Sequence, residues 1–196
     1  AANLVIVLAV ALPAAVGFAL ALPAFDRLLV PPSFQGAFSA FMAPLLPGFV
    51  ALAIFQAGLY PAFLLEKRTL VATLAALAGL ATNLGIILAF GGAPPGLYAW
   101  AQMSAFLVVL VVTGWAALRI LPVWPSLRDC GAVLLAVAAM ALAIWPLQNR
   151  LPAVVELGLQ VGLGALVYGC VILACDVARW RTLLGLWWTV RRSRRN

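Results

Sequence analysis

Long apolar runs alternate with short polar breaks along the chain as far as residue 175. A helix needs roughly 20 residues to cross the hydrocarbon core of a bilayer, which is about 30 Å thick. Six runs satisfy this length: Leu4–Phe25, Ala37–Leu65, Leu70–Phe90, Leu97–Leu121, Cys130–Leu147 and Pro152–Cys175. Proline, glycine and nearly all the charged residues gather in the breaks, as is typical of turns. The pattern predicts six transmembrane helices, and the alternating segments of a membrane barrel are absent from it.

Composition supports a bilayer protein. The chain is 66% hydrophobic and 9% charged, whereas a soluble domain is about 45–50% apolar and about a quarter charged. We therefore expect an all-α fold, a polytopic membrane bundle of six transmembrane helices with a basic amphipathic helix at its C-terminus. We attribute the net charge of +7 to the residues that orient the chain in the membrane and attract anionic lipid. No nucleic-acid partner is expected for so apolar a chain.

The cations are distributed unequally between the two sides of the predicted bundle. Ten lie on one side, namely Lys67, Arg68, Arg119, Arg128 and the six arginines after Cys175. Only Arg27 and Arg150 lie on the other. Loops rich in Lys and Arg stay in the cytoplasm, so the split predicts a multi-pass protein of the inner membrane with both ends of this chain in the cytoplasm. The cluster at residues 66–68 then anchors the topology.

The chain divides into a transmembrane lobe, residues 1–176, and a tail, residues 177–196. In the tail, four apolar residues share one helical face: Trp180, Leu184, Trp187 and Trp188. Such a helix is expected to lie in the membrane interface, and the terminal arginines to bind anionic lipid: Arg191, Arg192, Arg194 and Arg195. The first residue is Ala1 rather than methionine, no basic region precedes the first apolar run, and no small-residue cleavage site is visible. The start therefore does not resemble a signal peptide, and we expect the sequence to be part of a longer protein.

Residues that could carry chemistry are few. The chain has no histidine, and its five acidic residues lie at predicted helix ends, most of them beside an Arg or Lys, where we expect interfacial ion pairs. No two carboxylates are spaced to share a metal or a glycosidic bond. The three cysteines lie apart and are expected to be reduced packing residues. The sequence therefore predicts no metal, no cofactor and no enzymatic activity.

The second predicted helix is unusually irregular. It is nearly thirty residues long and contains Pro44, Pro47 and Pro61. Proline removes a backbone donor and kinks a helix, and a broken helix at membrane depth survives only against protein or a water-filled cavity. Two interpretations remain open: these prolines shape a transport site, or they make kinks that serve packing alone.

Three amide side chains lie inside predicted helices, and we take them as candidate residues of a substrate pathway. Asn83 and Gln102 lie equally far from the turn that joins their helices, so they should share one depth and could hydrogen-bond; Gln56 is the third. They either join helices, which is routine in membranes, or line a path for a sugar head group. Leucines of the third helix should face lipid and its small residues other helices. Gln160, beside Gly158 and Gly162, is expected to serve packing.

The order of features resembles the C-terminal half of polysaccharide and oligosaccharide flippases, in the superfamily that also contains multidrug and toxin exporters. The resemblance covers about Leu4 to Leu147 and is carried by FDRLLVPPSFQGAF, LLEKRT and ATNLGIILAFGGAPPGLYAWAQMSAFL. It implies one lobe of a two-lobed transporter that flips polyprenyl-pyrophosphate-linked oligosaccharide across the inner membrane for surface polysaccharide synthesis. One departure is that no cation lies mid-helix to meet the pyrophosphate.

Three other functions remain open. A drug or cation exporter of the same superfamily would need an acid inside the membrane, which this lobe has only at helix ends. A non-transporting assembly subunit of an envelope complex would use the irregular helices only for packing. A membrane transferase is disfavoured because histidine and loop-borne acid clusters are lacking.

Overall fold

The computed structural model describes residues 2–92, 94, 96–120 and 124–176. Helices account for nearly all of these residues, and the described part of the chain has no strand. Six helices are long and apolar enough to cross a membrane: Asn3–Leu29, Ala37–Leu65, Thr69–Ala89, Gly96–Ile120, Leu127–Leu147 and Ala153–Cys175. The six predicted spans and the all-α fold are confirmed. The predicted tail helix and its arginines lie outside the described residues.

The spans are made of seven α-helices and two short irregular segments that continue them. The α-helices are α1 (Ala2–Leu29), α2 (Ala37–Ala53), α3 (Tyr60–Leu65), α4 (Thr69–Ala89), α5 (Gly96–Ile120), α6 (Leu127–Ile144) and α7 (Ala153–Cys175). A π-helical segment, η2 (Ile54–Leu59), joins α2 to α3, and a 3₁₀ turn, η3 (Trp145–Leu147), extends α6. A further 3₁₀ turn, η1 (Pro32–Phe34), lies in the loop after α1.

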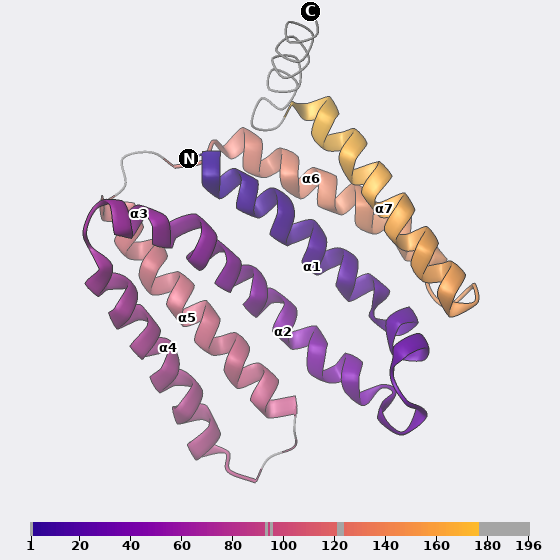
Figure 1. Cartoon of the computed structure of the whole chain (residues 1–196), viewed down its shortest axis with the longest axis horizontal. Helices are drawn as coiled ribbons and strands as arrows, with labels where there is room; N and C mark the ends of the chain where they lie inside the picture. Colours follow the sequence, from indigo (N-terminus) through magenta and orange to yellow (C-terminus); the bar gives the residue numbers. More distant parts are fainter. Residues whose placement is uncertain (1, 93, 95, 121–123, 177–196) are drawn as a thin grey trace, which may run out of the picture.

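The helices form a row rather than a closed ring (Figure 1). Helix α4 packs on α5, α5 on α2, and α2 on α1; α6 and α7 pack on each other and on the other side of α1. Helix α1 also contacts η2. It therefore joins the α2–α5 group to the α6–α7 pair.

Successive spans run in opposite directions, so their ends collect at two ends of the bundle (Figure 1). Four cations lie at the end that holds the start of α1: Lys67 and Arg68 between α3 and α4, Arg119 in the last turn of α5, and Arg128 in the first turn of α6. Arg27 and Arg150 lie at the opposite end, next to the ends of α1 and η3. The structure separates the described cations as the sequence predicts.

Small residues allow the close helix contacts. A Cβ on Gly79 of α4 would lie 2.6 Å from Val109 Cγ2 and 3.0 Å from the Ala105 carbonyl oxygen of α5. The leucines of the opposite face of α4 are exposed, as expected for a lipid-facing stripe: Leu70, Leu74, Leu77, Leu84 and Leu88. In a membrane, such small residues let helix backbones approach where hydrophobic burial gives no driving force.

The two glycines beside Gln160 make no close helix contact within the described residues. Gly158 and Gly162 of α7 are exposed, and a Cβ on either would meet no atom within 4 Å. The glycine of α7 that permits a close approach is Gly164, whose Cβ would lie 2.8 Å from Ile144 Cδ1 of α6. The reason is geometric: Gly158 and Gly162 lie four residues apart and share a helix face, and that face is turned away from α1 and α6.

Candidate functional site

The three amides singled out from the sequence line one cleft. It lies between α2 with η2 on one side and α4 with α5 on the other, and has a volume of about 340 Å³. Its lining combines Gln56, Asn83 and Gln102 with apolar and small residues: Leu52, Phe55, Ala76, Gly79, Leu80, Ala105, Phe106 and Val109. The cleft thus brings together polar groups from three different spans.

Asn83 and Gln102 are hydrogen-bonded to each other across α4 and α5. Asn83 Nδ2 donates to Gln102 Oε1 over 3.1 Å, and both side chains are partly buried. Asn83 lies six residues before the end of α4 and Gln102 six residues after the start of α5, which places both about 9 Å inside the same end at about 1.5 Å per residue. The predicted equal depth and the direct hydrogen bond are confirmed.

Gln56 lines the part of the cleft that is nearer to the opposite end of the bundle. It lies nine residues before the end of α3, about 14 Å inside the bundle end that holds Lys67 and Arg68. Its side chain is exposed, and no hydrogen bond of its amide is found among the described residues. The cleft therefore carries polar groups on both sides of the middle of the spans.

The irregularity of this span lies at η2 rather than at the first two prolines. Pro44 and Pro47 lie inside α2, which is α-helical from Ala37 to Ala53. The hydrogen-bond pattern changes only at Ile54–Leu59, immediately before Pro61 enters the first turn of α3. A single π-helical turn inside an α-helix occurs frequently at functional sites. The sequence predicted an irregular helix but did not locate the change.

The free donors and acceptors of the cleft are all neutral. Each amide has one carbonyl acceptor and two N–H donors, and the Asn83–Gln102 bond uses one donor and one lone pair of this set. No described residue that lines the cleft is charged. Such a surface can bind hydroxyl and amide groups, which both donate and accept, whereas a phosphate would need cations.

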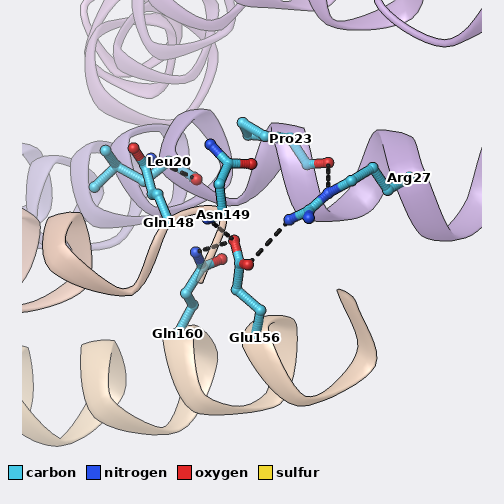
Figure 2. Close-up of polar contacts among 7 residues, drawn as sticks. All are labelled: Leu20, Pro23, Arg27, Gln148, Asn149, Glu156 and Gln160. Carbon is cyan, nitrogen blue, oxygen red and sulfur yellow. Dashed lines mark hydrogen bonds and ion pairs between the residues drawn. The ribbon is translucent and has the colours of Figure 1, made fainter. Parts of the chain in front are cut away.

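A second polar cluster lies at the opposite end of the bundle from Lys67 and is centred on Glu156 (Figure 2). The ion pair expected for this acid is present, but its partner and its burial were not predicted. Glu156 in the first turn of α7 is fully buried, and its Oε2 lies 3.0 Å from Arg27 Nη2 of α1. Its Oε1 accepts from the backbone N–H of Asn149 over 3.1 Å and from Gln160 Nε2 over 3.2 Å. The cluster ties α1, α7 and the loop between α6 and α7 together.

Two further contacts complete this end of the bundle. Arg27 Nε donates to the Pro23 carbonyl over 3.1 Å, and Gln148 Nε2 donates to the Leu20 carbonyl over 2.8 Å (Figure 2). Both acceptors belong to α1. Gln160 was expected to serve packing, and its side chain is indeed buried, but it also fixes the carboxylate.

Asp26 has a different role from the ion pair expected for it. Its Oδ2 accepts from the Gly36 N–H over 2.6 Å and from the Ser39 hydroxyl over 2.9 Å. These donors lie at the N-terminus of α2, where backbone N–H groups lack helical partners and the helix dipole favours a negative charge. Asp26 therefore caps the helix that follows it. Asp26 lies inside α1, ten residues before Gly36, and no signal in the sequence joined the two.

No group of three or more His, Cys, Asp or Glu side chains lies close enough to hold a metal ion in the described ranges. The cysteines that the structure describes are free thiols. The chemistry that the described residues offer is therefore hydrogen bonding in the cleft and one buried ion pair.

Comparisons with protein-family models, with curated protein sequences and with solved structures found no match for this chain.

Proposed function

We propose that this protein moves polyprenyl-pyrophosphate-linked oligosaccharide across the bacterial inner membrane by alternating access. The observation that carries the proposal is the cleft in which Gln56, Asn83 and Gln102 meet between η2, α4 and α5. Polar side chains inside membrane spans are costly and mark pathways. The resemblance of the sequence to flippases of polysaccharide precursors points to the same class of substrate.

The chemistry of the cleft suits the sugar rather than the rest of the substrate. Sugar hydroxyl and acetamido groups match the mixed donors and acceptors of three amides. The pyrophosphate would be bound weakly there, because no described lining residue is cationic. The polyprenyl tail would stay in the bilayer, which is as apolar as the tail itself. The cleft would thus guide the head group only.

A second lobe is part of this proposal. Gln56 is exposed about 14 Å inside the span, where contact of its amide with lipid would be unfavourable. An N-terminal lobe of similar architecture would cover this face and leave a polar space between the two repeats, where midplane substrate sites of transporters lie. Both ends of the present chain would be cytoplasmic, and the basic tail would bind anionic lipid.

The exporter alternative receives less support. Coupling to a cation calls for an acid that is free to bind it inside the membrane. Glu156 is paired with Arg27, and Asp26 accepts from the N-terminus of α2. These two buried acids therefore have structural partners at one end of the bundle, away from the cleft amides.

The test replaces each cleft amide by leucine in the complete protein, in a host that depends on it for surface polysaccharide. We expect Gln56→Leu, Asn83→Leu and Gln102→Leu to lower surface polysaccharide and to accumulate lipid-linked precursor, with protein abundance unchanged. Thr73→Leu is the matched control, because Thr73 is exposed on α4 and does not line the cleft.

Two outcomes would contradict the proposal. If polysaccharide stays normal in all three variants, the cleft is not on the sugar pathway. If it falls only in proportion to protein abundance, the amides merely join helices, each contributing about 0.6 to 2 kcal/mol to stability, and an assembly subunit becomes the better interpretation.

A further inference from the structure

The first turn of α1 docks against the π-helical segment that carries Gln56. Asn3 Nδ2 donates a hydrogen bond to the backbone carbonyl of Ala57. Leu4 packs against the buried cluster that contains Leu59 and Phe63. Helix α1 therefore contacts this span through one polar and one apolar side chain, and the polar contact is to Ala57, the residue that follows Gln56.

The hydrogen bond from Asn3 replaces one that the helix cannot make. In an α-helix the carbonyl of Ala57 would accept from the N–H of residue 61, which is a proline and has none. The π-helical turn itself ends with the N–H of Tyr60 bonded to the carbonyl of Phe55. An unpaired carbonyl at membrane depth is unfavourable, since no water is present to bind it. Asn3 supplies the missing donor from another helix.

The packing at this contact is as specific as the hydrogen bond. A Cβ on Gly58 would lie 2.5 Å from Leu4 Cδ1, closer than two carbon atoms can approach. A larger residue at position 58 would force the Leu4 side chain to move. Asn3 and Leu4 thus meet Ala57 and Gly58, the two residues that follow Gln56 in the chain.

We infer that Asn3 is a positioning residue that holds the η2 backbone at Ala57 and thereby keeps residue 56 in the cleft. The inference rests on the proposed function in taking Gln56 as part of the sugar pathway. A shift of one residue in helix register turns the side chains by about 100°. Without the Asn3 hydrogen bond the Ala57 carbonyl loses this donor, so the η2 backbone would rearrange around it, and a rearrangement of that size turns residue 56 away from the cleft.

The geometry also makes the coupling reciprocal. A ligand that hydrogen-bonds Gln56 in the cleft favours the register in which Ala57 is bonded to Asn3, and the Asn3 contact in turn favours ligand binding. The first turn of α1 contributes no residue to the cleft lining, although Leu4 packs against the cluster that includes Ala116 and Ala117 of α5. Movement of α1 relative to η2 would therefore change the cleft through η2.

The test measures the position of residue 56 directly, by cross-linking Gln56→Cys to Ala76→Cys in the full chain with its native cysteines replaced by serine. Ala76 also lines the cleft and lies seven residues after the start of α4, at a depth of about 11 Å from the same end. With a short thiol-reactive cross-linker in membranes, we expect Asn3→Leu to lower the cross-linking rate about tenfold, equivalent to about 1.4 kcal/mol.

Two further variants separate positioning from general damage. Asn3→Gln keeps an amide donor and should restore most of the rate, whereas Thr73→Val, which removes a hydrogen bond within α4, should leave it unchanged. An unchanged rate in Asn3→Leu, or failure of Asn3→Gln to restore it when both variants are folded by gel filtration, would overturn the inference. The result is independent of transport, so failure of the proposed sugar pathway would be seen separately.

Discussion

Replacement of Arg27 by leucine should destabilise the protein more than replacement of Glu156 by glutamine, although both changes break the same ion pair. The carboxylate of Glu156 is fully buried, whereas the Arg27 side chain is 40% exposed. Without Arg27, the carboxylate keeps only neutral donors, among them Asn149 N–H and Gln160 Nε2. An uncompensated buried charge of this kind costs about 3–5 kcal/mol.

The opposite replacement is milder because both remaining partners have alternatives. A glutamine at position 156 can still accept from Asn149 and Gln160, and the exposed guanidinium of Arg27 can turn toward water or lipid head groups. The loss is then that of one hydrogen bond to a charged group, about 1.5–3 kcal/mol. The double variant should lose less than the sum of the single losses, because it leaves no unpaired buried charge.

The measurement is the free energy of unfolding of the purified protein in mixed micelles, for both single variants and the double variant. Arg150→Leu is the control, since Arg150 lies near the same end and forms no ion pair among the described residues; it should change stability by less than about 0.5 kcal/mol. Equal losses for Arg27→Leu and Glu156→Gln, or strict additivity in the double variant, would refute the reasoning.

Three shorter predictions concern packing, orientation and the tail. Gly79→Leu should lower stability by about 1–3 kcal/mol through overpacking against α5, while Gly85→Leu, which faces open space, should be nearly neutral; similar melting of both variants would contradict this. Reporters fused after Arg68 should be cytoplasmic and those at Gly92 periplasmic, and a periplasmic signal after Arg68 would reverse the topology. A peptide of residues 177–196 should bind anionic vesicles, at about 1 kcal/mol per cation near the surface, and salt should release it; binding that ignores salt would exclude the arginines as its cause.

The spans and the Asn83–Gln102 bond could be predicted because neither depends on contacts between distant parts of the chain. Hydropathy over 20 residues marks a span without any tertiary contact. The depth of Asn83 and Gln102 follows from counting residues on each side of one short turn, since each residue advances a helix by a fixed rise. The bond is confirmed.

The contacts between distant helices could not be predicted in this way. Arg150 and Arg27 are both possible partners for Glu156 by sequence distance or depth, and only the packing of α7 on α1 selects Arg27. Likewise, the π-helical turn at η2 inserts a single residue into the helix register, a change too small for a hydrophobic pattern to reveal.

The ion pair between Arg27 and Glu156 has a consequence for synthesis, because 129 residues separate its partners. At about 5–20 residues per second, the ribosome needs about 6 to 26 seconds to make the chain between them. During this interval Arg27 has already reached the end of the first span while α7 does not yet exist. The arginine must wait in the head-group region at the end of its helix, where its long side chain stays hydrated. Arrival of α7 then completes the cluster, so that α1 and α7 are joined only after the spans between them have been made.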